Sequence, residues 1–153
     1  MKENINEKWN KIVSINKEID DLYHKIADSY HFSDSVFWVL YSLYTENGEL
    51  TQKEICDNWA YSKQTINSTI KNLLEFNYIE MDKDKPSNHG KKIRLTKLGQ
   101  KICDETIFHV IQAEEQSFSK VNEKGLDIVI DILNSSYMAF KKEIEKNGGK
   151  DCE

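Results

Sequence analysis

Residues 50–77 read LTQKEICDNWAYSKQTINSTIKNLLEFN, and this stretch decides the fold. Thr51 and Glu54 have the spacing of a capping box, in which each side chain accepts a hydrogen bond from the other residue's backbone amide. This pattern predicts a short helix from Glu54 to about Asn58. Residues 59–61 then form a break before a second predicted helix.

The second helix begins at Ser62, a preferred N-cap residue, and is predicted to end near Asn77, because Asn tolerates the left-handed conformation of a helix end. Its apolar stripe consists of Ile66, Ile70, Leu73 and Leu74. Its opposite face carries amides, hydroxyls and ammoniums: Lys63, Gln64, Thr65, Asn67, Ser68, Lys71 and Asn72. The first carboxylate, Glu75, comes only in the final turn, whereas the other predicted helices mix acids into their polar faces.

Polar groups of these kinds match the chemistry of a DNA major groove, which admits a single helix. Gln and Asn side chains bind adenine edges, Lys binds guanine, and Ser and Thr reach bases or phosphates. Two helices joined by a short break, the second with such a face, predict a DNA-binding helix-turn-helix.

Beyond this unit the apolar period changes from helical to alternating. Residues 78–82 and 92–96 alternate as strands do, and the connection between them is rich in turn residues. They predict a β-hairpin, the wing of a winged helix-turn-helix, and the only β structure that we expect. Basic side chains gather on it, in reach of a DNA backbone: Lys83, Lys85, His89, Lys91 and Lys92.

The flanking segments are predicted to be helical, so the fold class is mainly α. Apolar residues recur at helical spacing over residues 5–26 and 126–144, and Asn122 is an N-cap for the second of these segments. A nearly all-apolar helix over residues 33–44 is expected at the centre of the core. One long helix is predicted over residues 96–120. Its inward-facing residues are predicted to be Ile102, Ile107, Val110, Ile111 and Phe118.

The net charge of -5 is unevenly distributed over the 153 residues. Residues 51–101 carry 9 Lys and Arg94 against 6 acids, a net charge of +4, whereas residues 1–50 and 102–153 have net charges of -4 and -5. A local excess of positive charge attracts phosphate whatever the total charge of the chain. From charge alone, the alternative is a Lys-rich surface that is merely solvated.

Composition and motifs disfavour several classes of protein. The longest uncharged apolar run, residues 35–45, is shorter than the roughly 18 residues of a membrane span, and no apolar secretory segment opens the chain, so we expect a cytoplasmic protein. We find no catalytic motif, phosphate-binding loop or metal-ligand spacing, so we expect neither an enzyme nor a bound metal or cofactor. Cys56, Cys103 and Cys152 form no CxxC pair, and their odd number excludes a fully paired intramolecular set, so we expect free thiols.

Taken together, residues 32–101 resemble the multiple antibiotic resistance regulator (MarR) family of bacterial transcription factors. The matching motifs lie at residues 33–44, 50–56, 62–67, 73–79 and 93–99. The last of them contains Leu-Thr-x-x-Gly, a frequent family signature at the end of the wing. Many members place an arginine in the wing that enters the minor groove, whereas this chain offers Lys or His there.

The resemblance implies an intertwined homodimer that represses transcription by binding a palindromic operator in double-stranded DNA. Residues 1–32 and 102–147 would form the dimer, residues 33–101 the DNA-binding domain, and residues 148–153 a tail. Alternatively, the acidic terminal helices pack back on their own subunit. The predicted DNA-binding residues are Thr51, Gln52, Ser62, Lys63, Gln64, Thr65, Asn67, Ser68, Lys71, Lys85, Asn88, His89, Lys91 and Lys92.

The resemblance also implies a small aromatic or anionic effector that changes the separation of the two DNA-binding lobes. The candidate effector-binding residues are Trp9, Tyr30, Trp38 and Tyr41. Aromatic residues at helical spacing are more often plain core, and that alternative stays open. The rival function is a winged-helix module that binds another protein and no DNA. A DNA-binding protein differs from it by a steep fall of affinity with salt.

Overall fold

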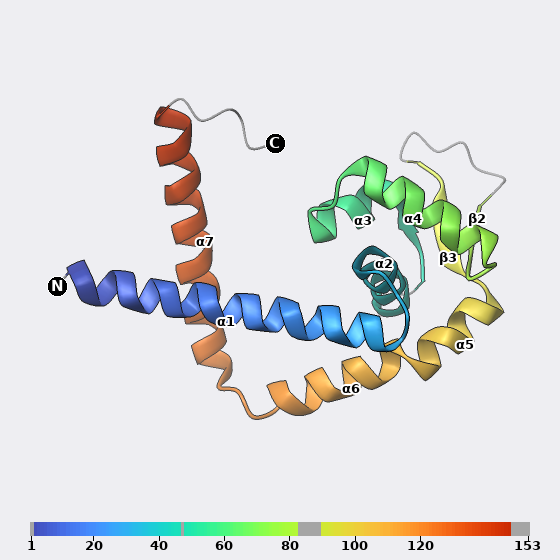
Figure 1. Cartoon of the computed structure of the whole chain (residues 1–153), viewed down its shortest axis with the longest axis horizontal. Helices are drawn as coiled ribbons and strands as arrows, with labels where there is room; N and C mark the ends of the chain where they lie inside the picture. The colour runs from blue at the N-terminus through green and yellow to red at the C-terminus, as the bar shows by residue number, and fades with distance from the viewer. Residues whose placement is uncertain (1, 47, 83–89, 148–153) are drawn as a thin grey trace. The chain divides into compact units, whose positions relative to one another are not determined.

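The computed structural model describes residues 2–46, 48–82 and 90–147, with residues 2 and 3 described by their backbone alone. The chain forms two compact units, Met1–Val110 and Ile111–Glu153. The elements in chain order (Figure 1) are α1 (Lys2–Ser29), α2 (Asp34–Thr45), β1 (Leu50–Thr51), α3 (Gln52–Trp59), α4 (Lys63–Glu75), β2 (Ile79–Met81), β3 (Lys92–Leu95), α5 (Lys97–Glu105), α6 (Ile107–Phe118) and α7 (Glu123–Lys146). The predicted fold class, mainly α with a winged helix-turn-helix, is confirmed.

Local capping signals place these helix starts within two residues of where the sequence predicts them. Five side chains each accept a hydrogen bond from an amide in the first turn of the following helix: Ser33, Thr51, Ser62, Thr96 and Asn122. The capping box is complete, because Glu54 Oε2 accepts a hydrogen bond from the Thr51 amide at 2.6 Å. The break between α3 and α4 is a left-handed residue, Ala60, with a φ of 53°, and Asn77 after α4 has a φ of 55°.

A small antiparallel sheet of order β1-β3-β2 joins the helix-turn-helix to the wing. Strands β2 and β3 are the predicted hairpin. Strand β1 is a correction to the prediction that the hairpin is the only β structure, because Leu50 pairs with Ile93 and Thr51 with Lys92. Two residues are too few to show an alternating pattern, and their partner strand lies far away in the sequence.

The single helix predicted over residues 96–120 is wrong, because the chain leaves helical geometry at Thr106, where φ is -130° and ψ is -74°. The Thr106 hydroxyl donates a hydrogen bond to the Ile102 carbonyl at 2.7 Å. Threonine does not break a helix as Gly or Pro does, so the sequence pattern predicts a continuous helix across Thr106. Of the predicted inward-facing residues, Ile107 and Val110 are buried, whereas Phe118 is 58% exposed.

Helix α2 lies at the centre of the first unit, as predicted, and contacts α1, α3, α4, α5 and β3. Its side chains Phe37, Leu40 and Leu43 are fully buried. Helix α4 buries Ile66 against this core. The buried face also includes Thr69, which the predicted stripe lacked, whereas the predicted Leu74 is 37% exposed. The core therefore fixes which face of α4 points outward.

Gly99 lets α5 pack directly against the start of the wing. A Cβ at this position would lie 1.9 Å from the Tyr78 carbonyl oxygen, which no side chain tolerates. In the same place the Thr96 amide donates to the Tyr78 carbonyl at 3.0 Å, and the Thr96 hydroxyl donates to the Asn77 carbonyl at 2.6 Å. The Leu-Thr-x-x-Gly motif thus has a physical reason, since Thr96 and Gly99 together dock α5 on the chain entering β2.

The terminal helices expose much apolar surface. None of the residues of α7 is buried, and side chains such as Tyr137 and Phe140 are 61% and 68% exposed. On α1, Ile5 and Leu22 are 65% and 57% exposed. A single chain therefore leaves the apolar stripes of both helices uncovered.

Candidate nucleic-acid interface

The polar face of α4 is the candidate reading surface. Because its apolar side chains turn toward α2, the opposite face is left to solvent. All of the predicted polar residues of that face are exposed: Lys63, Gln64, Thr65, Asn67, Ser68, Lys71 and Asn72. The only carboxylate of this helix is Glu75, its last residue. An exposed surface of donors without a carboxylate suits a polyanion with acceptors on its base edges.

The hydroxyls of this face are partly used within α4 itself. Ser62 Oγ lies 2.8 Å from Thr65 Oγ1 and accepts the Thr65 amide at 3.1 Å. Ser68 Oγ donates to the Gln64 carbonyl at 2.8 Å. Within the described residues, the side chains that remain without a hydrogen bond or ion pair are Lys63, Gln64, Asn67, Lys71 and Asn72. For these five side chains, hydrogen bonds to a nucleic acid would replace bonds to water, and no hydrogen bond within the protein would be lost.

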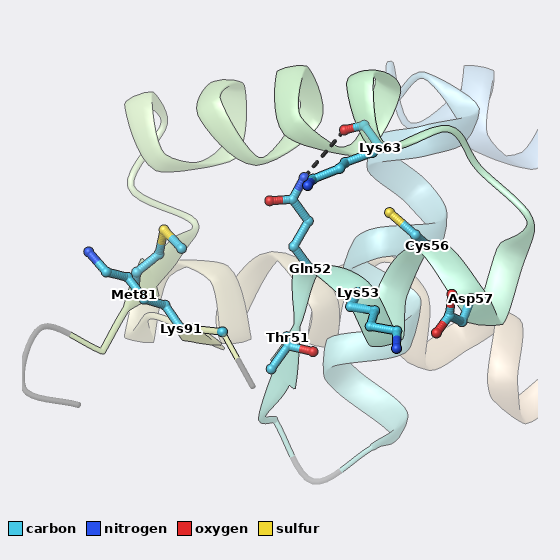
Figure 2. Close-up of a pocket in the computed structure, with 9 residues that line it drawn as sticks. Thr51, Gln52, Lys53, Cys56, Asp57, Lys63, Met81 and Lys91 are labelled. Carbon is cyan, nitrogen blue, oxygen red and sulfur yellow. Dashed lines mark hydrogen bonds between the residues drawn. The ribbon is translucent and has the colours of Figure 1, made fainter. Parts of the chain in front are cut away.

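Two predicted contact residues at the start of α3 have structural partners instead. Thr51 is only 4% exposed, and its hydroxyl donates to Glu54 Oε2 at 2.8 Å while it accepts the Glu54 amide at 3.2 Å. The capping box therefore occupies the Thr51 side chain and leaves little of it to contact DNA. Gln52 Nε2 donates to the Lys63 carbonyl at 3.3 Å and so ties α3 to the start of α4 (Figure 2).

A hollow of about 560 Å³ separates α3 and the start of α4 from the base of the wing (Figure 2). Its lining residues are Thr51, Gln52, Lys53, Cys56, Asp57, Lys63, Met81, Gly90 and Lys91. Three of these carry an ammonium and one carries a carboxylate, so the hollow has a net positive lining. Beside the α4 face, such a concave basic surface fits a phosphate backbone passing between helix and wing.

The described part of the wing contributes two predicted lysines in different states. Lys91 is exposed, whereas Lys92 is half-buried and its Nζ lies 3.3 Å from Glu54 Oε2. The capping bonds from Thr51, followed by Lys92, hold the pKa of Glu54 below its ordinary value. The positive charge of Lys92 is therefore already paired with the ionised carboxylate of Glu54. The predicted contacts Lys85, Asn88 and His89 lie outside the described residues.

The chain's one arginine, which we had not assigned to the site, lies at the base of the wing. Arg94 Nη2 is 2.6 Å from Glu49 Oε1 and 3.8 Å from Asp82 Oδ2. Its Nε is buried and has no hydrogen-bond partner in the described part of the chain. The pairing joins residues far apart in the sequence, so no local motif signalled it.

The candidate effector residues do not form one group. Trp38 stacks on Trp59 with ring centroids 4.0 Å apart, and Tyr41 meets Trp59 edge-on at 5.9 Å. Trp59 was absent from the predicted set, although it lies at the end of α3 and links the aromatic residues of α2 to the helix-turn-helix. Trp9 lies roughly 21 Å along α1 from Tyr23, the nearest residue of α1 in this cluster, given a rise of about 1.5 Å per residue.

The thiols of the described residues are poorly suited to redox chemistry. Burial raises the pKa of Cys103 to about 12 and also raises the pKa of Cys56. Because the thiolate is the reactive form, both stay protonated near neutral pH. Cys152 lies outside the described residues.

Neither a metal site nor a membrane span is found in the part of the chain that the structure describes. Across residues 2–46, 48–82 and 90–147, no group of three or more His, Cys, Asp or Glu side chains is arranged to hold a metal ion. Within the same ranges, no helix combines the length and apolar content needed to cross a bilayer.

Comparison with known proteins identifies the same fold. A family model described as the MarR family matches residues 32–85 and confirms the resemblance drawn from the sequence motifs. A MarR family regulator from Neisseria meningitidis is 21% identical, with 92% of this chain and 98% of that chain covered and a TM-score of 0.77. A MarR/EmrR family transcriptional regulator from Acinetobacter sp. ADP1 is 20% identical, with coverages of 88% and 97% and a TM-score of 0.65.

A third structure adds a ligand. Staphylococcus aureus MarR, solved in complex with salicylate and kanamycin, is 18% identical, with coverages of 90% and 93% and a TM-score of 0.64. No curated protein sequence matches the chain. At these identities the likenesses establish the fold, which is that of MarR family regulators.

Proposed function

We propose that this chain, with the fold of MarR family regulators, is a cytoplasmic, homodimeric transcriptional repressor that reads a palindromic operator through the major groove. The exposed, carboxylate-free face of α4 carries this proposal. Each of the other described helices carries at least one acid, and α1, α3, α5 and α7 also carry lysines, as expected for solvated faces. A base-reading helix must instead avoid repulsion from phosphates on both sides of the groove.

The roles of the predicted residues follow from their positions. Lys63, Gln64, Asn67 and Lys71 would contact base edges, because their side chains are exposed and without partners in the described chain. Lys53 and Lys91, on either side of the hollow, would contact phosphates. Phosphate contacts set register and affinity, whereas base contacts set sequence preference.

Homodimerisation is supported by the uncovered apolar side chains of α1 and α7. Exposed apolar patches of this extent on a soluble chain mark an interaction surface. A two-fold dimer also supplies the second reading helix that a palindromic operator requires. Residues 1–32 and 102–147 would form this dimer, and residues 33–101 would bind DNA.

An aromatic or anionic effector is the proposed signal. Its support is the aromatic cluster around Trp38 and Tyr41, which reaches α3 through Trp59. Salicylate, the ligand of the Staphylococcus aureus structure, belongs to this chemical class. A ligand that prefers one spacing of the two reading helices would shift the dimer toward that spacing and away from the operator.

The test is selection of bound sequences from a random pool of duplexes by the full-length chain. The proposal predicts a two-fold symmetric sequence whose half-sites are spaced by one helical turn or a multiple of it. Affinity for the selected duplex should fall steeply as salt is raised, by about 0.9 in log–log slope for each neutralised phosphate. Enrichment of no sequence, together with a flat salt response, would favour the rival protein-binding module.

A further inference from the structure

A very short strand pairing is one of the contacts that join the wing to the helix-turn-helix, beside the packing of β3 on α2 and of β2 on α4. Strand β1 consists of Leu50 and Thr51, which pair with Ile93 and Lys92 of β3. A pairing of two residues on each strand constrains the sheet weakly, because the twist between strands varies widely and very small pairings are only marginally stable. Other contacts must therefore help to define the angle at which the hairpin leaves the helix-turn-helix, and the buried side chains of Ile79 and Ile93 supply some of them.

Two ion pairs lie at the two ends of this junction. Glu49, the residue before β1, pairs with Arg94 at 2.6 Å. Glu54, in the first turn of α3 after β1, pairs with Lys92 at 3.3 Å. Each pair joins the β1–α3 segment to β3, and Ile93 lies between the two cations, fully buried. The hairpin is thus held at two points on either side of a buried side chain, which opposes rotation about the junction.

The arginine is built into the junction rather than extended from it. Its Nε is buried and its guanidinium faces two carboxylates, Glu49 and Asp82. A guanidinium whose charge is already paired with carboxylates attracts a DNA phosphate only weakly. Its planar, multiply donating geometry instead suits a fixed bridge between elements.

The same contacts continue to the reading helix. Glu54 completes the capping box that starts α3, and Gln52 in the same turn donates to the Lys63 carbonyl at the start of α4. On the other side of the junction, Gly90 packs near the Thr51 side chain, since a Cβ on this glycine would lie 3.8 Å from Thr51 Cβ. These contacts therefore link the orientation of β3 to the first turn of α3, and through that turn to α4.

We propose that Arg94, through its ion pair with Glu49, is a positioning residue that fixes the angle between the wing and the reading helix. In this proposal Arg94 itself contacts no DNA. The geometry of the proposal comes from the junction, and its consequence for DNA binding rests on the proposed function. The consequence is that Lys91 and the hairpin reach the DNA backbone only while the pair is formed. Lys92 and Glu54 provide the second point of attachment.

The angle can be measured without DNA, by residual dipolar couplings of backbone amides in the full-length, ¹⁵N-labelled chain. In the wild type, the couplings of β2 and β3 should fit the same alignment frame as those of α4. In Arg94→Gln and in Glu49→Gln, the couplings of β2 and β3 should lose amplitude or require a different frame, while those of α4 stay unchanged. Arg94→Lys, which retains the charge but not the planar guanidinium, should restore the wild-type pattern only in part.

The matched control is Lys101→Gln, which also removes one cation of an exposed pair, Lys101 with Glu105 at 3.8 Å on α5. It should leave all couplings as in the wild type. Wing couplings that are unchanged in Arg94→Gln, or that already need their own frame in the wild type, would overturn the proposal.

A second arm uses the selected duplex and hydroxyl-radical footprinting. Arg94→Gln should lose protection at the flanking nucleotides and flatten the salt slope by about one for each phosphate that the wing no longer neutralises, with the sequence preference of the half-site unchanged. Loss of the central footprint or of the base preference would instead indicate a general structural role and overturn the positioning role. If the wild type binds no duplex, the proposed function fails, and the dipolar couplings alone still decide whether Arg94 positions the wing.

Discussion

Asn67 is the residue on which base recognition is most directly tested, because it is exposed on α4 and its side chain has no partner within the described chain. We expect Asn67→Ala to weaken binding to the selected duplex by about 1–3 kcal/mol and to relax the preference at one base pair, since alanine cannot form the two hydrogen bonds of an amide to a base edge. Titration of labelled duplexes by fluorescence anisotropy measures both effects. Lys63→Ala should cost a similar amount.

The control for this prediction is Asn10→Ala, which removes an exposed amide from α1. It should bind the duplex as the wild type does. Wild-type affinity in both Asn67→Ala and Lys63→Ala would contradict the assignment of α4 as the reading helix.

Gly99 makes a prediction about stability at the same scale. Because an added Cβ would meet the Tyr78 carbonyl oxygen at 1.9 Å, Gly99→Ala must push α5 away from the entry to β2. Overpacking of this kind costs about 1–3 kcal/mol. The free energy of unfolding, from urea titrations followed by circular dichroism, should fall by at least about 1 kcal/mol.

Gly125→Ala is the matched control, because the nearest atom to its added Cβ is 3.8 Å away, in ordinary contact. Within α7, alanine should raise the stability by up to about 1 kcal/mol, since glycine is the poorer helix former. Equal effects of the two substitutions would show that the close approach at Gly99 is not a constraint.

At the scale of elements, the capping box at the start of α3 holds both the helix-turn-helix and β1. Thr51→Ala should lower the free energy of unfolding by about 1 kcal/mol, because the first-turn amide of Glu54 loses its acceptor. Thr51→Ser keeps the hydroxyl and should retain most of the stability. Chemical denaturation of the two variants side by side separates the effect of the hydroxyl from that of the methyl group.

The contribution of Glu54 also has a defined pH dependence. Its pKa is lowered in the folded chain by the bonds from Thr51 and then by Lys92, so folding favours the ionised carboxylate. The stabilisation is therefore fully present above the ordinary carboxyl pKa, and it is lost as pH falls through the lowered value. The gap in stability between the wild type and Glu54→Gln should narrow over that acid range, and a gap independent of pH would contradict this origin.

The elements show what local sequence can and cannot predict. Capping residues and left-handed positions act within one turn, so Ser62, Asn77 and the capping box located the ends of α3 and α4 to within two residues. The exposed face of α4 was likewise predictable, since the apolar stripe fixes the opposite side. Strand β1 and the break at Thr106 were not, because the first depends on a distant partner and the second on a common residue in an uncommon conformation.

The candidate site divides in the same way. The residues of α4 could be found from side-chain type and helical spacing alone. Thr51 is ambiguous in the sequence, because a threonine at a helix start suits a cap and a phosphate contact equally, and its burial in the structure favours the cap. Trp59 and Arg94 gained their roles from tertiary partners, Trp38 and Glu49, which no sequence window contains together.

For the whole molecule, the proposed dimer predicts that charge on the apolar stripe of α7 dissociates the protein. Phe140 is 68% exposed in the single chain, and burying such a side chain contributes about 1.5–3 kcal/mol. Two-fold symmetry places each substitution at the interface twice, so Phe140→Glu should weaken the dimer by at least about 3 kcal/mol, or more than a hundredfold. Sedimentation velocity should show the shift from a dimer toward a species of 17.9 kDa.

Asn134→Glu adds the same charge on the face of α7 that already carries Asp127 and Asp131 at helical spacing, and it should leave the dimer intact. Phe140→Glu should also lose affinity for the two-half-site duplex far more than for a single half-site, because only the dimer joins the two reading helices. Sedimentation of the wild type as a species of 17.9 kDa would contradict the proposed dimer. In that case the exposed stripes of α1 and α7 would have to be covered by a different protein, and the rival protein-binding function would gain its strongest support.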